Sequence, residues 1–106
     1  MQDMSINQGD SLYLSIIKYD DEGNEVAFDE NDKIKFTAKR KLNQKTYDIE
    51  SDNARIVDGV AIIEIPPNKT NIRLGEYYYD IQFTTPNADV FTICKGMLTV
   101  EWDVTD

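Results

Sequence analysis

The sequence predicts an all-β protein, an antiparallel β-sandwich of seven or eight short strands. Apolar and polar residues alternate at a period of two along most of the chain, as in strands that bury one face. Turn-forming sequences separate these segments, and no long helix is expected. A length of 106 residues suits one two-layered domain. A partly open barrel with the same number of strands is the alternative, because sequence does not set the order of strand pairing.

The first half of the chain contains four expected strands. Alternation begins at Leu12, and the acidic sequence 20–24, with Gly23 near its tip, predicts a hairpin. In the following strand Ile34 and Phe36 alternate with lysine and threonine, which gives it one wet face. The expected strands of this half are 12–17, 25–28, 34–39 and 46–49.

The second half contains four more expected strands, at 57–65, 76–84, 90–95 and 97–104. Pro66 and Pro67 end the first of them, because proline cannot donate a ladder hydrogen bond. The strand 76–84 has the most regular alternation, so we place it at the centre of a sheet. Gly96 is expected to form a bulge or kink, and the last strand is expected to direct Trp102 toward the core with Leu98 and Val100.

Composition limits the domain organisation and the cell compartment. We expect residues 1–106 to form a single sandwich domain, with residues 1–10 as a flexible N-terminal arm. The longest apolar run is far shorter than a membrane span, and the N-terminus lacks a secretion signal, so neither a membrane nor export is expected. The single cysteine, Cys94, cannot form an intramolecular disulfide, as is usual in a reducing cytoplasm.

Several functional classes are disfavoured. A net charge of −9 opposes binding to nucleic acid phosphates. The chain has no histidine, which removes the commonest general base and metal ligand.

Asp80 could in principle act in glycoside hydrolysis, but twenty acidic residues bring carboxylates together by chance. Cys94 is interpreted as a packing residue and the acidic turn 20–24 as a solvated hairpin tip. We therefore predict no enzyme, no catalytic or metal-binding residue and no cofactor.

Four residues are candidates for contact with other proteins. Tyr78 alternates with inward-facing tyrosines and is expected to face solvent, where it serves either an interface or a cross-strand aromatic pair. Lys39, Arg40 and Lys41 form a positive cluster on an acidic chain. They are expected either to meet an acidic neighbouring subunit or to form a solvated strand end.

Three sequence motifs follow one another in a characteristic order along the chain. Asn7-Gln8-Gly9-Asp10 precedes the first strand, Leu74-Gly75-Glu76-Tyr77-Tyr78-Tyr79-Asp80-Ile81-Gln82-Phe83 forms the central one, and Leu98-Thr99-Val100 begins the ending. This order resembles small immunoglobulin-like structural domains of tailed bacteriophages and prophages, nearest to the N-terminal domain of baseplate upper proteins of Gram-positive hosts. The resemblance covers nearly the whole chain and implies an immunoglobulin-like sandwich without catalytic residues.

The resemblance also implies a function and a location. We expect a non-enzymatic structural or assembly protein of the tail baseplate or the head–tail junction, made in the bacterial cytoplasm and located in the virion. Its expected partners are other virion structural proteins and copies of itself. The sequence stops at Asp106, without the stem and receptor-binding region of longer baseplate proteins, so we expect an adaptor or accessory piece. The alternative is a carbohydrate-binding or adhesion module in which Tyr78 or Trp102 stacks on sugar rings.

Overall fold

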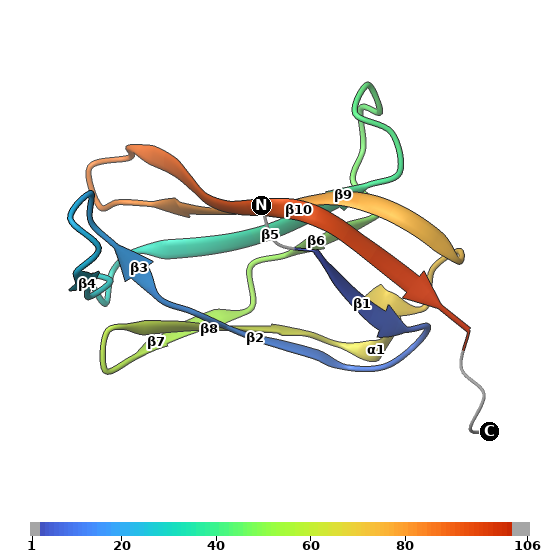
Figure 1. Ribbon diagram of the computed structural model, residues 1–106, viewed down its shortest axis with the longest axis horizontal. Coiled ribbons are helices and arrows are strands. Elements are labelled where there is room, and N and C mark those ends of the chain that lie inside the picture. Colours follow the sequence, from blue (N-terminus) through green and yellow to red (C-terminus); the bar gives the residue numbers. More distant parts are fainter. Residues whose placement is uncertain (1–2, 103–106) are drawn as a thin grey trace.

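The computed structural model, which describes residues 3–102, has ten strands and one short helix, and eight of the strands form two layers (Figure 1). The prediction of an all-β fold is confirmed, although the described chain has more strands than expected. The elements are β1 (Met4–Asn7), β2 (Leu12–Ile16), β3 (Lys18–Tyr19), β4 (Glu25–Val26), β5 (Lys33–Lys39), β6 (Ile49–Ser51), β7 (Ala54–Val57), β8 (Val60–Ile65), α1 (Pro67–Thr70), β9 (Gly75–Thr84) and β10 (Val90–Glu101).

The larger layer is a five-stranded sheet in the order β1-β10-β9-β5-β6. Strand β9 lies in its centre, as its regular alternation predicts. The sheet is mixed, because β1 pairs in parallel with the end of β10, from Met4 opposite Leu98 to Asn7 opposite Glu101. Part of the expected flexible arm, residues 1–10, is therefore strand β1, with Ile6 buried in the core.

The smaller layer is a three-stranded antiparallel sheet in the order β2-β8-β7. The expected single strand 57–65 is wrong: Val57 pairs with Val60 across a two-residue turn, so two strands occupy this region. Asp58 and Gly59 both have positive φ, 51° and 79°. This is the conformation that twisted two-residue hairpins require, and it is why an Asp-Gly pair turns the chain here.

The strand order is that of an immunoglobulin-like fold. Strands β10, β9 and β5 match the G, F and C strands of one sheet, and β2, β8 and β7 match the B, E and D strands of the other. A second feature of this fold is present at the start of β9, where the Tyr77 hydroxyl donates a hydrogen bond to the backbone carbonyl of Arg73. The small β3–β4 hairpin lies in the connection between the two sheets that precedes β5.

The core lies between the layers and is built from the inward faces of both sheets. Phe36 stacks on Tyr79 with ring centroids 5.5 Å apart, and Phe28 and Phe83 form a T-shaped pair with centroids 5.5 Å apart. Such pairs add to the stability gained from burial of apolar area. The buried hydrophobic residues are Ile6, Phe28, Ile34, Phe36, Ala38, Ile49, Ala61, Ile63, Ile65, Tyr77, Tyr79, Ile81, Phe83, Leu98 and Val100.

The last strand differs from the prediction in three ways. Strand β10 is continuous from Val90 to Glu101, and its irregularity falls between Thr92 and Cys94 rather than at Gly96. Trp102 is 68% exposed instead of buried, because β10 has ended before it. Residues 103 and 104 of the predicted strand lie outside the described residues. Within residues 3–102, no helix is long and apolar enough to cross a membrane.

Candidate functional site

A groove of about 520 Å³ lies on the outer face of the five-stranded sheet, away from the three-stranded sheet. Its floor is formed by β5, β9 and β10, and the loop between β5 and β6 provides a wall. Figure 1 shows this loop standing above the sheet. Leu42 and Tyr47 project from the loop, and Leu42 is 72% exposed. The groove is also lined by Thr37, Lys39, Tyr78, Asp80, Lys95 and Met97.

Tyr78 lies in the floor of this groove and is 42% exposed. The alternation in β9 turns Tyr77 and Tyr79 into the core and Tyr78 outward, as predicted. The residues directly across the strands from Tyr78 are Lys39 and Met97. Neither neighbour is aromatic, so a cross-strand aromatic pair does not account for Tyr78, and its ring remains available for contact.

The predicted basic cluster is divided in the structure. Lys39 lines the groove with its ammonium group 5.0 Å from the centre of the Tyr47 ring. Arg40 points elsewhere: Nη1 donates to the Leu74 carbonyl at 3.3 Å, and the guanidinium lies over the Tyr77 ring. Lys41 is exposed in the loop. Of the three, Lys39 therefore lines the groove, and Lys41 lies in the loop that forms its wall.

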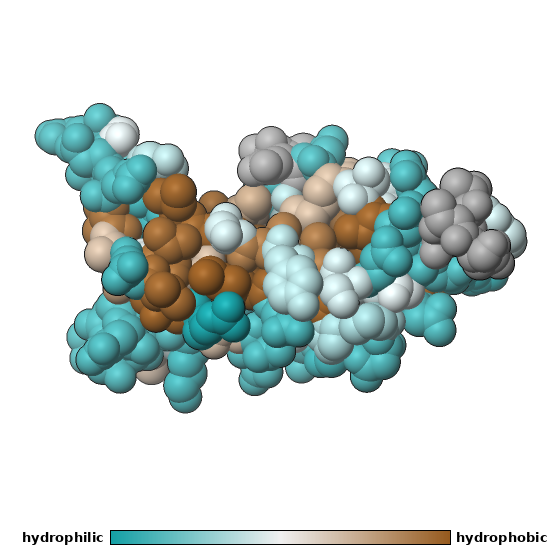
Figure 2. Space-filling model, turned by 90° about the horizontal axis from the view of Figure 1, so that it is seen from below, coloured by the Kyte–Doolittle hydropathy of each residue, from teal (hydrophilic) through white to brown (hydrophobic). Residues whose placement is uncertain are grey.

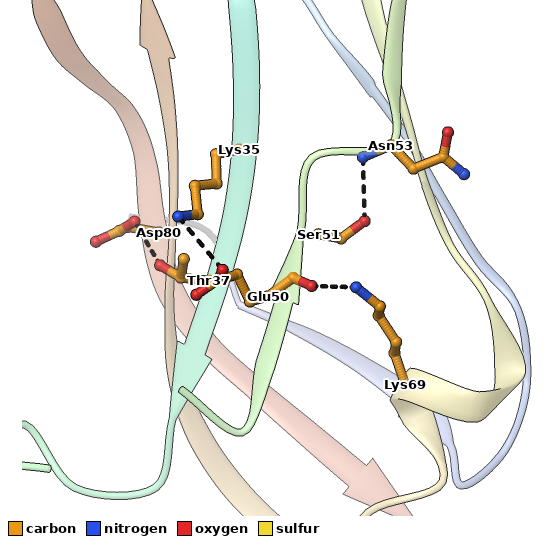
Figure 3. Close-up of polar contacts among 7 residues, drawn as sticks. All are labelled: Lys35, Thr37, Glu50, Ser51, Asn53, Lys69 and Asp80. Atoms are coloured by element: carbon orange, nitrogen blue, oxygen red, sulfur yellow. Dashed lines mark hydrogen bonds and ion pairs between the residues drawn. The ribbon is translucent and has the colours of Figure 1, made fainter. Parts of the chain in front are cut away.

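Polar contacts tie the strands together beside the groove (Figure 3). The Thr37 hydroxyl on β5 donates to Asp80 on β9 at 3.0 Å, so this carboxylate is already engaged. Lys35 and Glu50 form an ion pair at 3.5 Å across β5 and β6, and both side chains are about half exposed. Solvent-exposed pairs of this kind contribute at most about 1 kcal/mol. Asp80 thus has a hydrogen-bond partner on the neighbouring strand β5.

A second apolar surface covers the outer face of the three-stranded sheet. Figure 2 shows this face, with hydrophobic side chains gathered toward one end. Ile17 and Val57 are each 44% exposed. Val60 lies opposite Val57, and Ile62 is the next residue on the same outward face of β8. We call these four residues the aliphatic patch. Exposed patches of large aliphatic side chains mark contact sites more often than chance placement does.

The sequence analysis missed several of these residues. Val57, Val60 and Ile62 belong to a segment in which both alternating faces are apolar, a pattern that indicates a strand covered on both sides. That signal could have revealed the aliphatic patch. Leu42 and Tyr47 come from a loop without periodicity, so no pattern in the sequence places them against Tyr78.

The hydroxyl of Tyr79 is a buried titratable group beside Cys94. The Tyr79 hydroxyl lies 3.6 Å from Cys94 Sγ. Burial, and next the hydrogen bond with Cys94, raise the pKa of Tyr79 far above the usual tyrosine value. This phenol stays protonated at neutral pH and offers no base. Among residues 3–102, no three His, Cys, Asp or Glu side chains are grouped to hold a metal ion.

The acidic turn 20–24 is a well-ordered hairpin tip. Oδ1 of Asp20 accepts hydrogen bonds from the backbone N–H groups of Glu22 and Asn24, both at 2.9 Å. The bond from Asn24 is the main reason that the pKa of Asp20 lies below its ordinary value. The tip is thus fixed by its own backbone, with Asp21 and Glu22 exposed to solvent.

No protein-family model matches the chain, and none of the curated proteins matches it.

Proposed function

We propose that this chain is a non-enzymatic structural or assembly protein of a phage or prophage particle, in the tail baseplate or at the head–tail junction. It acts through contacts with other virion proteins and with copies of itself. One observation carries the proposal: two separate apolar surfaces, the groove and the aliphatic patch, occupy opposite outer faces of one small domain. A component held between neighbours needs two such surfaces, whereas a module for one ligand needs one.

Two further features support the proposal. The strand order is immunoglobulin-like, which agrees with the phage domains that the sequence motifs resemble. The fold by itself names no function, because many unrelated proteins share it. The groove supplies the more specific support, since its exposed tyrosines and its half-buried Met97 are residue types enriched in protein interfaces.

The test is to look for the chain in particles of the phage or prophage whose genes surround its own. Particles are purified by density gradient and their proteins are quantified by mass spectrometry. We expect the chain to co-migrate with the particles in a fixed ratio to the tail proteins. A chain that is expressed during particle production but washes away from intact particles would contradict the proposal.

A carbohydrate-binding module is the second candidate, because two exposed tyrosines border the groove beside polar groups. Tyr47 and Tyr78 could stack on sugar rings while Asp80 and Lys39 bind hydroxyls. However, the Lys39 ammonium already lies over one face of Tyr47. Binding on a glycan array that is lost in Tyr78→Ala, while Trp102→Ala retains it, would favour this function over the structural one.

A further inference from the structure

Charge is strongly segregated along the chain. Residues 20–32 contain seven of the twenty acidic residues and no basic residue. The next thirteen residues, 33–45, contain six of the eleven basic residues and no acidic residue. The chain as a whole carries −9, so the second segment is a positive region on a strongly negative molecule.

The fold places these two segments toward opposite ends of one strand. The acidic segment holds the tip of the β3–β4 hairpin, strand β4 and the connection that leads into β5, and the basic segment holds β5 and the loop that follows it. Because β5 has seven residues, its ends are roughly 20 Å apart. Figure 1 shows β3 and β4 at one end of the sandwich and the β5–β6 loop toward the other.

The groove at the basic end combines an apolar floor with lysines. Tyr78 and Met97 form the floor, and Lys39 and Lys95 stand beside them. Asp80 is the acidic residue among the lining side chains, and its carboxylate accepts the hydrogen bond of Thr37. The groove is therefore suited to an occupant that carries both apolar and acidic side chains.

The β3–β4 hairpin at the acidic end has this composition. Tyr19 and Val26 are exposed on its two strands, and Asp21 and Glu22 are exposed at its tip. The hydrogen bonds of Asp20 hold the tip in one conformation, which reduces the entropy lost when it docks. Hairpin and groove are thus complementary in charge and share exposed apolar side chains.

We propose that the β3–β4 hairpin of one copy of this chain docks in the lysine-lined groove of the next, in a head-to-tail contact. This inference rests on the proposed function, in which the domain acts through protein–protein contacts. It specifies a second copy of the chain as one of the partners. The two surfaces are different parts of the molecule, so the contact is heterologous. Such contacts repeat around a ring or along a filament.

The first measurement is sedimentation velocity of the purified chain over a range of concentrations at low and high salt. We expect self-association that weakens as salt is raised, because the attraction is between exposed charges. Contact through the aliphatic patch would instead be unchanged or strengthened by salt, since added salt screens the repulsion of two acidic molecules. A strict monomer at high concentration and low salt overturns the inference.

Charge-reversal variants then locate the contact. Lys39→Glu/Lys95→Glu alters the groove, and Asp21→Lys/Glu22→Lys alters the hairpin. Each variant alone is expected to associate at least about tenfold more weakly than the wild type. A mixture of the two variants is expected to associate again, because each supplies the intact surface that the other lacks. Circular dichroism and thermal unfolding confirm that each variant is folded before the comparison.

A matched control separates this contact from a general effect of charge. Arg55→Glu/Arg73→Glu makes the same change in net charge away from the groove and the hairpin, and it is expected to associate more strongly than Lys39→Glu/Lys95→Glu. If the control is the weaker of the two, or if the mixture stays monomeric, the head-to-tail contact is wrong. The proposed function is tested separately, by whether the chain is found in phage particles. The head-to-tail contact can therefore be wrong while the proposed function holds.

Discussion

The Tyr77 hydroxyl donates a hydrogen bond to the carbonyl of Arg73, four residues earlier in the chain. Tyr77 is fully buried at the start of the central strand β9, and Arg73 lies in the connection that crosses from the three-stranded sheet. The bond therefore fixes the corner at which the chain passes between the layers. It also supplies a donor to a carbonyl that no ladder satisfies in this irregular segment.

Replacing Tyr77 by phenylalanine should destabilise the fold while leaving its aromatic packing in place. The variant loses one hydrogen bond and leaves the Arg73 carbonyl without its donor, which costs about 1–2 kcal/mol. Tyr78→Phe is the matched control, since Tyr78 is exposed on the same strand, and it should change stability by less than about 0.5 kcal/mol. Urea unfolding measures both, and equal midpoints for the two variants would refute the structural role of the corner.

The alternation of side chains made much of the sheet predictable. Tyr77 and Tyr79 face inward and Tyr78 outward because successive side chains point to opposite faces, and this rule needs no knowledge of the partner strand. The same rule failed for Trp102, which has the right period but lies beyond the last residue of β10. Alternation along a strand predicts the face of the sheet on which a side chain lies. The side chain is buried only where a second layer packs against that face.

The pairing of strands that are far apart in the chain could not be predicted from the sequence. Met4 lies opposite Leu98, so the partner of β1 is separated from it by almost the whole chain. The hairpin between β7 and β8 was different, because Asp58-Gly59 is a strong local turn signal. Apolar residues flank this pair on both sides, and that pattern predicts one continuous strand instead of two. The groove also depends on long-range contacts that the sequence does not indicate, since Leu42 reaches it from an irregular loop.

Gly59 should tolerate substitution less well than Gly23. Both have positive φ, so alanine introduces backbone strain of roughly 1–2 kcal/mol at either position. A Cβ at Gly59 would also lie 2.7 Å from Cβ of Ala27, whereas nothing lies within 4 Å at Gly23. Gly59→Ala should therefore cost about 1 kcal/mol or more beyond Gly23→Ala, because the neighbouring backbone must shift.

Thermal unfolding of the two glycine variants provides the comparison. Gly23→Ala controls for the strain common to both turns, and the difference between the midpoints reports the contact with Ala27. A Gly59→Ala protein at least as stable as Gly23→Ala would show that the β7–β8 turn does not pack against this residue.

Tyr79 should be the last tyrosine to ionise. Burial and the Cys94 hydrogen bond raise its pKa above the unfolded value of about 10. The folded state keeps the proton after the unfolded state has lost it, so this contribution to stability is complete below pH ~10 and declines as the pH rises further. An alkaline absorbance titration should show a late tyrosine step, coincident with unfolding, that Tyr79→Phe lacks. A late step of unchanged size in Tyr79→Phe would assign it to another residue.

Lowering the pH should loosen the β3–β4 hairpin tip. The backbone N–H of Asn24, followed by that of Glu22, stabilises the ionised carboxylate of Asp20, so its pKa is below the ordinary aspartate value. The stabilisation is therefore complete above that ordinary value and is lost as the pH falls through the folded pKa. In a proton–nitrogen NMR titration, the Glu22 and Asn24 amides should shift together with this low midpoint.

Two variants test the assignment of that midpoint to Asp20. Asp20→Asn keeps an oxygen acceptor that does not titrate, so the shared step should disappear while the tip stays ordered. Asp20→Ala removes the acceptor, and its amides should exchange faster with solvent at every pH. A midpoint at or above the ordinary aspartate value would mean that these two N–H groups do not hold the carboxylate. The hairpin would then lack the fixed conformation that makes docking in the groove favourable.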